Sequence, residues 1–138
     1  MRELAFDPRS GKPALVRFFH RVYNALRPGG LFIFDIVEPG LAPDGTPQRR
    51  FSEGPDWAIL LEVREDRKHR ILTRRISSFR QVGRLYRRSQ ELHRLHLFPR
   101  AEFQAMLSQV GFQVSTLSGY GRLRFAPAHV GFLARKAS

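Results

Sequence analysis

Glu91 and His93 are the residues of this sequence whose types and spacing best suit acid–base chemistry. They stand two positions apart, so on an extended strand both side chains project from one face. A carboxylate can orient a neighbouring imidazole, which then becomes a candidate general base for a substrate hydroxyl or amine. A structural network of glutamate, histidine and arginine would use the same pair. The sequence leaves both interpretations open.

Five other residues are candidates for contact with a substrate. Arg75 and Arg87 carry guanidinium groups that can bind an acidic group through two hydrogen bonds, although solvated strand arginines are the alternative. Asp35 ends an apolar segment, where binding residues gather in doubly wound folds, and its alternative is to cap the following turn. Trp57 and Tyr120 could form aromatic walls of a small-molecule pocket, and a place in the core is the alternative for Trp57.

Neither a metal site nor a nucleotide site is predicted. His93 and His96 stand three positions apart, which places them on opposite faces of a strand, and no carboxylate pair completes a ligand set. The chain has no cysteine, and therefore no thiolate ligand, cysteine nucleophile or disulfide. Gly29-Gly30 and the Gly119–Gly121 pair lack the spacing of a phosphate-binding G-x-G-x-x-G turn, so no cofactor-binding residue is assigned.

Two helices and an apolar strand must position these residues. Apolar residues recur at intervals of one, three and four positions from Pro13 to Leu26, which predicts an amphipathic helix that Gly29 and Gly30 end in left-handed conformations. A second helix follows Pro99 and ends at Gly111. The strand Leu31–Ile36 is apolar on both faces, as is typical of an inner strand of a parallel sheet with helices on each side.

One edge of this strand lacks a neighbour within the sequence. An unpaired, flat, hydrophobic edge invites pairing with another chain or aggregation. We therefore expect one of three things: an upstream coding region, a partner chain, or a poorly behaved fragment.

The remaining segments form a loop, a meander and a terminal strand pair. Residues 38 to 56 contain many prolines and glycines, which predicts a long loop. Alternating side chains then predict an antiparallel meander, in which Arg74 and Ile76 share one face while Arg75 and Ser77 share the other. The predicted strands are Trp57–Glu65, Arg70–Arg80, Arg84–Leu97, Gln113–Leu117 and Val130–Lys136.

Composition narrows the class of protein. A chain of 138 residues with 42% hydrophobic residues is long enough for one folded domain with its own core. The first residues lack the apolar stretch of a secretion signal, and the longest apolar run is too short to span a bilayer. We expect a soluble, cytoplasmic protein with no membrane partner.

The formal net charge of +12 would attract nucleic acid, anionic lipid or acidic metabolites. However, 21 of the 24 basic residues are arginines dispersed over predicted helices, strands and loops, and a GC-rich genome explains this bias more simply than phosphate binding. A basic nucleic-acid-binding domain is therefore the second hypothesis, and the dispersal of the arginines argues against it.

The string from Leu26 to Asp35 resembles a family signature. Its order of Leu-Arg-Pro-Gly-Gly, apolar strand and aspartate is similar to the motif around the fifth strand of class I, Rossmann-like methyltransferases that depend on S-adenosylmethionine (SAM). Met106-Leu107 with Gly111-Phe112 resembles a later L-x-x-x-G-F element. The resemblance covers residues 12–37 and 99–137. The middle, residues 56–97, is similar to the substrate-cap insertion of a small-molecule branch, on the strings Arg74-Arg75-Ile76, Tyr86-Arg87-Arg88 and Glu91-Leu92-His93.

This resemblance implies an α/β fold: the last three strands and two helices of a Rossmann-like methyltransferase sheet, with an inserted antiparallel β-meander, all in one partial domain over residues 1–138. It implies methyl transfer from SAM to oxygen, nitrogen or carbon of a small molecule. The glycine-rich cofactor loop has no counterpart here, so a C-terminal portion that is inactive alone is expected. Its partners would be a homodimer mate or a separate N-terminal half at the exposed sheet edge. A non-catalytic remnant that pairs with a cofactor-binding chain is the third hypothesis.

Overall fold

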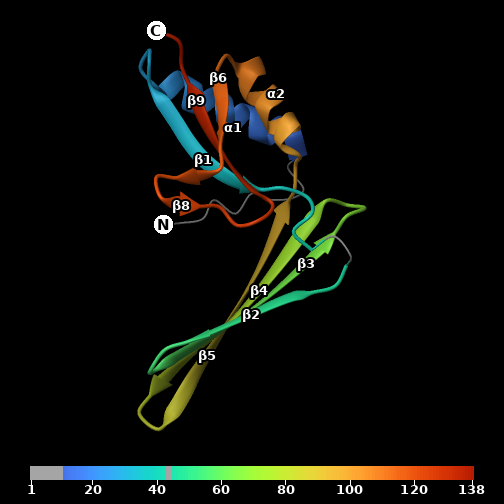
Figure 1. Cartoon of the computed structure of the whole chain (residues 1–138), viewed down its shortest axis with the longest axis vertical. Coiled ribbons are helices and arrows are strands. Elements are labelled where there is room, and N and C mark those ends of the chain that lie inside the picture. The colour runs from blue at the N-terminus through green and yellow to red at the C-terminus, as the bar shows by residue number, and fades with distance from the viewer. Residues whose placement is uncertain (1–10, 43–44) are drawn as a thin grey trace. The chain divides into compact units, whose positions relative to one another are not determined.

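The computed structural model describes residues 11–42 and 45–138, which form two compact units (Figure 1). The helical unit comprises residues 11–41 and 97–138, and the meander unit comprises residues 42 and 45–96. None of the helices in these described ranges is long and apolar enough to cross a membrane.

The helical unit contains two helices and a three-stranded sheet. The sheet has the order β1-β9-β6, and the central strand β9 runs antiparallel to both neighbours. β1 and β6 therefore run parallel to each other without being paired. A two-stranded hairpin of β7 and β8 lies in the predicted loop before β9. The elements are α1 (Gly11–Ala25), β1 (Leu31–Val37), α2 (Arg100–Val110), β6 (Gln113–Leu117), β7 (Gly119–Tyr120), β8 (Leu123–Arg124) and β9 (His129–Arg135).

Both helices form where the spacing of apolar residues predicts them. Pro13 lies in the first turn of α1, where its missing N–H breaks no hydrogen bond. Gly111 ends α2 with a φ of 121°, and its N–H donates to the carbonyls of Leu107 and Ser108.

The turn after α1 differs from the prediction in one respect. Gly29 is left-handed, with a φ of 80°, but Gly30 is not. Gly30 is needed because a Cβ there would lie 2.8 Å from a backbone carbonyl oxygen. The last carbonyls of α1 are capped from the far end of the chain, since Lys136 Nζ donates to Tyr23 O at 2.9 Å and to Leu26 O at 3.0 Å.

Five phenylalanines form the centre of the helical unit, and we call them the phenylalanine cluster. Phe19 of α1 contacts Phe32 and Phe34 of β1, with ring centroids 6.3 and 5.8 Å apart. Phe103 of α2 contacts Phe19 at 6.0 Å and Phe132 of β9 at 5.8 Å. Both helices therefore cover the same face of the sheet.

The other face of the sheet corrects the prediction for Leu31–Ile36. Phe32 and Phe34 face the helices, whereas Leu31 and Ile33 on the opposite face are 50% and 49% exposed. Helical cover on both faces is therefore wrong for the described residues, because α1 and α2 lie on one side. The predicted unpaired edge is present: β1 pairs with β9 alone among the described residues.

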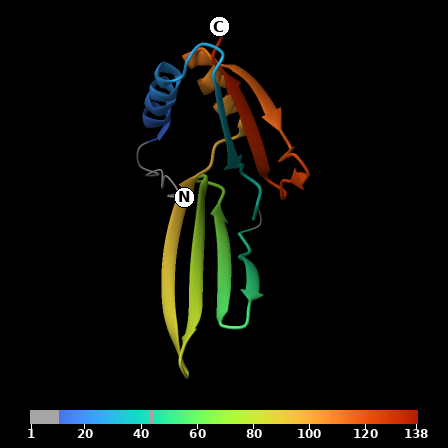
Figure 2. The ribbon, with the colours of Figure 1, turned by 90° about the vertical axis from the view of Figure 1, so that its left-hand side faces the viewer.

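The meander unit is one antiparallel sheet of four strands, in the order β2-β3-β4-β5 (Figure 2). Three of them match the predicted strands to within two residues at each end. The fourth, β2, lies inside the segment predicted as a loop, and all six of its residues are exposed. An exposed edge strand shows no alternation that a sequence pattern could reveal. The strands are β2 (Gln48–Glu53), β3 (Trp57–Asp66), β4 (Ile71–Val82) and β5 (Leu85–His96).

Cross-strand pairing fixes which side chains share a face of this sheet. Arg74 pairs with His93 and Ile76 pairs with Glu91, so these four side chains share what we call the His93 face. Arg75, one position away, lies on the opposite face, which we call the Arg75 face. The predicted division of β4 and β5 into two faces is confirmed.

Candidate functional site

Asp35 and Tyr120 meet at the carboxyl end of β1, although 85 positions separate them in the sequence. The Tyr120 hydroxyl donates to Asp35 Oδ1 at 3.1 Å. The Tyr120 ring also meets the Phe125 ring edge-on, with 4.8 Å between centroids. Phe125 lies over Gly131, which pairs with Asp35, and a Cβ at Gly131 would come within 2.9 Å of that ring. We call these four residues the β1-end cluster.

The β1-end cluster lies on the sheet face that the helices leave uncovered. Asp35 Oδ2 has no hydrogen-bond partner among the described residues, so the carboxylate can accept a further bond from a hydroxyl or an amine. Burial, and then the bond to Asp35, raise the pKa of Tyr120, which keeps its phenol protonated as a donor. The arrangement suits a ligand with a polar hydrogen and an apolar ring face.

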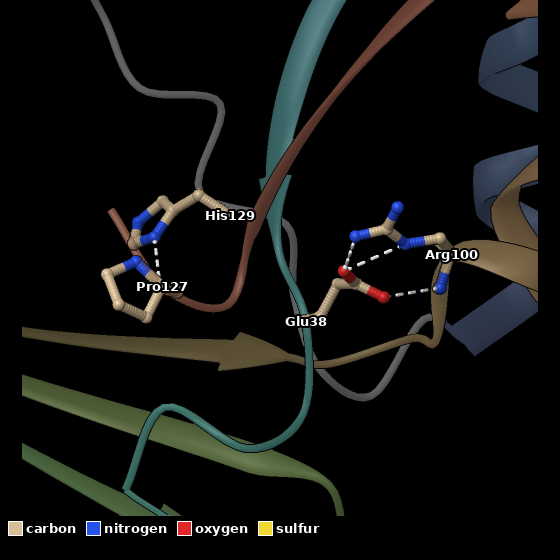
Figure 3. A network of polar contacts seen from close by, with 4 residues as sticks. All are labelled: Glu38, Arg100, Pro127 and His129. Atoms are coloured by element: carbon tan, nitrogen blue, oxygen red, sulfur yellow. Dashed lines mark hydrogen bonds and ion pairs between the residues drawn. The ribbon is translucent and has the colours of Figure 1, made fainter. Parts of the chain in front are cut away.

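Glu38, directly after β1, is held at the same end of the sheet (Figure 3). Its carboxylate accepts bonds from Arg100 Nη2 at 2.7 Å, from Arg100 Nε at 3.0 Å and from the Arg100 backbone N–H at 3.1 Å. Its own N–H donates to Ala128 O at 2.7 Å. At the start of β9, His129 Nδ1 donates to the carbonyl oxygen of Pro127, in the preceding loop, at 2.9 Å.

The Glu38–Arg100 ion pair fixes both protonation and chain path. The hydrogen bonds from the Arg100 side chain lower the pKa of Glu38, and the carboxylate raises the pKa of Arg100 in turn. Glu38 lies where the chain leaves the helical unit, and Arg100 lies where α2 begins after the chain returns. The sequence gives no sign of this pair, because 62 positions separate its members.

Glu91 and His93 are brought together as predicted. His93 Nε2 lies 3.2 Å from Glu91 Oε2, with the imidazole partly buried and the carboxylate exposed. Arg74 stands opposite His93 in the ladder and on the same face. The geometry accommodates both the oriented base and the structural network.

Arg75 and Arg87 do not converge. Arg75 lines an open hollow of about 290 Å³ on the Arg75 face, together with Arg49, Arg50, Phe51, Leu60, Leu61, Glu62 and Ser77. Arg87 pairs with Arg80 and therefore lies on the His93 face. One small anion cannot contact both guanidinium groups from opposite sides of a sheet.

The hollow is electropositive. Glu62 is its only carboxylate among the described lining residues, and the guanidinium groups of Arg64 and Arg49 bind it at 2.9 and 3.0 Å. These hydrogen bonds, that of Arg64 first, lower the pKa of Glu62.

Trp57 lies at the start of β3 with its ring partly exposed. A Cβ at Gly54 would overlap the indole, so glycine is needed there. Trp57 pairs with Arg80 and shares the His93 face with Arg87.

Across residues 11–42 and 45–138, no group of three or more histidine, aspartate or glutamate side chains is arranged to hold a metal ion. His93 and His96 lie on opposite faces of β5, as their spacing predicts.

Solved structures match the chain over almost its whole length. A SAM-dependent methyltransferase from Clostridium acetobutylicum matches with a TM-score of 0.74 and 19% identity, over 96% of this chain and 53% of that one. A sugar N-methyltransferase from Streptoalloteichus matches at 0.64 and 20%, over 97% and 51%. An amino pentose methyltransferase from Micromonospora echinaspora, solved with SAM bound, matches at 0.62 and 18%, over 92% and 52%.

These likenesses establish the fold. The chain has the fold of SAM-dependent methyltransferases and spans about half the length of the structures it matches. The resemblance indicated by Leu26 to Asp35 is confirmed at that level. The nucleic-acid alternative receives no support from these neighbours. No protein-family model and no curated protein sequence matches the chain.

The ion pair at Glu38 makes stability depend on pH. Glu38→Gln should lower the free energy of unfolding at neutral pH by about 1–2 kcal/mol, the low end for charge-assisted bonds, because Arg100 is half exposed. Since the folded-state pKa of Glu38 is lowered, this contribution is complete above the ordinary value of 4.5 and is lost as the pH falls through the lowered value. Urea unfolding at a series of pH values measures this contribution to the free energy of unfolding. Glu53→Gln, an exposed carboxylate of β2, is the control. A Glu38→Gln difference that persists unchanged in strong acid would contradict the assignment.

The pKa of Tyr120 should lie above the ordinary value for a tyrosine. Asp35→Asn should lower the pKa of Tyr120 part of the way toward its ordinary value of 10.0, because the carboxylate is lost while burial, the larger cause, remains. Ultraviolet absorbance of the phenolate against pH measures this change, and Tyr120→Phe identifies which transition belongs to Tyr120. An unchanged transition in Asp35→Asn would show that the hydrogen bond is absent in solution.

Proposed function

We propose that this chain supplies the acceptor side of a SAM-dependent methyltransferase that acts on a small molecule. One observation carries the proposal: the described residues match about half of such enzymes, and the β1-β9-β6 sheet presents an unpaired edge and an uncovered apolar face. In α/β folds such a sheet continues beyond its last paired strand and carries helices on both faces. The missing neighbours are those that the cofactor-binding half would provide.

The described residues do not themselves form a site for SAM. The sequence has no counterpart of the glycine-rich loop that holds the cofactor in this fold. The hollow of the meander unit is lined by arginines, and their positive charge would repel the sulfonium cation of SAM. When bound to the complete enzyme, SAM supplies an electrophilic methyl group. We infer that residues outside this chain hold it, and that the chain alone is inactive.

The residues of this chain would bind and orient the acceptor. Asp35 Oδ2 can accept a hydrogen bond from an acceptor hydroxyl or amine, beside the aromatic wall of Tyr120 and Phe125. His93, oriented by Glu91, is the candidate that removes a proton from the nucleophile. Trp57, Arg75 and Arg87 are proposed as further acceptor contacts, with Arg75 on the face opposite that of Trp57 and Arg87.

SAM binding tests whether residues outside this chain hold the cofactor. Calorimetric titration of SAM into the 138-residue chain should give no binding heat. The nucleotide sequence upstream of the Met1 codon should encode an in-frame strand, glycine-rich loop and helix, and the extended protein should bind SAM. Tight binding by the 138 residues alone, or none by the extended protein, would contradict the proposal.

His93 tests the acid–base role in the extended protein. His93→Gln should lower kcat by about 10²- to 10⁴-fold without changing SAM affinity, because a positioned general base contributes that much. His69→Gln is the matched control, since His69 Nδ1 makes a similar contact with Asp66 at 2.7 Å on an exposed turn. Reduced stability with unchanged kcat in His93→Gln would instead identify the pair as a structural network.

A further inference from the structure

The end of the β4–β5 hairpin projects beyond the rest of its own sheet. β3 begins at Trp57, opposite Arg80, and the Gln81 N–H donates to Asp56 O at 2.7 Å, so the strands pair only with each other from Val82 to Leu85. A two-residue loop closes the hairpin, with Gly83 at a φ of 64°. Gln81 Nε2 donates to Gly83 O at 3.1 Å, which holds the loop in shape. We call residues 80–88 the hairpin tip.

The hairpin tip exposes apolar side chains at its end. Leu85 is 76% exposed, Tyr86 65% and Val82 54%. Val82 and Leu85 are cross-strand partners and form one apolar pair at the apex, while Tyr86 projects from the other face. Exposed single apolar residues are ordinary, but three within five positions on a turn form a patch that favours a non-aqueous contact.

The hairpin tip also carries four arginine side chains whose positive charges are not balanced by a nearby carboxylate in the part of the chain that the structure describes. Arg80, Arg84, Arg87 and Arg88 have no ion-pair partner among the described residues. Residues 67–90 contain nine arginines and lysines and no aspartate or glutamate. A partner must therefore be anionic and must also accept aliphatic side chains.

We propose that the hairpin tip binds an anionic lipid surface, an interaction beyond the proposed methyl transfer. Val82, Leu85 and Tyr86 enter the boundary between head groups and acyl chains, and the four arginines bind lipid phosphates around them. That no helix of the described residues is long and apolar enough to cross a membrane does not bear on a surface contact of this kind.

Two other occupants fit the tip less well. Single-stranded nucleic acid needs aromatic rings on which successive bases stack, and the tip offers one tyrosine beside an aliphatic pair at a convex apex. A second copy of the tip would bring eight unneutralised arginines together, and like charges repel. An anionic bilayer offers phosphates to the arginines and an apolar interior to the aliphatic side chains at the apex.

Co-sedimentation of the 138-residue chain with vesicles tests the proposal. Binding should be strong to phosphatidylcholine vesicles that contain phosphatidylglycerol, weak to phosphatidylcholine alone, and reduced by salt. Arg84→Gln with Arg88→Gln should weaken binding roughly 25-fold, from about fivefold for each charge. Leu85→Ser should weaken it roughly tenfold, and Leu85→Trp should strengthen it.

The β7–β8 hairpin provides the matched control, because it also exposes a leucine beside arginines. Leu123 is 63% exposed between Arg122 and Arg124, and Leu123→Ser should leave vesicle binding unchanged. Equal binding to neutral and anionic vesicles, no response to either Leu85 variant, or an equal loss in Leu123→Ser would overturn the proposal. So would retention on single-stranded RNA, measured by fluorescence anisotropy, in the absence of vesicle binding.

Discussion

Packing of the phenylalanine cluster is the interaction on which the rest of the helical unit depends. Phe19 and Phe103 bring two helices, far apart in the sequence, onto the same face of one sheet, and Phe132 of the central strand lies fully buried beneath them. Truncation of one such ring typically costs about 3–5 kcal/mol, a large part of the stability of a small domain. These contacts determine which face of β1 is buried.

The position of the helices explains why the opposite side of the sheet is open. Because α1 and α2 lie on one face, no described element covers Leu31 and Ile33, and β1 pairs with β9 alone among the residues that the structure describes. An apolar face next to a free strand edge is costly in water and prone to association. The proposed cofactor-binding half would remove both costs in a single contact, which also places Asp35 beside the new surface.

Sequence patterns predicted the features that depend on local periodicity. The two helices, the division of β4 and β5 into faces, and the pairing of Glu91 with His93 follow from spacings of two to four residues. Strand β2 was not predicted because Arg49 and Arg50 lie on an exposed edge strand, which has no buried side and therefore no alternation of apolar residues. The apolar composition of Leu31–Ile36 predicts helices on both faces of its sheet. A strand that lacks these covering elements has the same composition, so the sequence does not distinguish the two cases. The contact between Asp35 and Tyr120 joins two residues that were each recognised separately, and only tertiary structure brings them together.

The contact between Glu38 and Arg100 also bears on the modular construction of the chain. Every residue of the meander unit lies between these two, which are themselves in direct contact within the helical unit. A short turn from Glu38 to Arg100 would therefore bypass β2 to β5 while retaining the three-stranded sheet, the β7–β8 hairpin and both helices of the other unit. Such an arrangement allows the intervening sheet to be exchanged, lengthened or lost between related proteins with little disturbance to the helical unit, so that the two units can diverge independently.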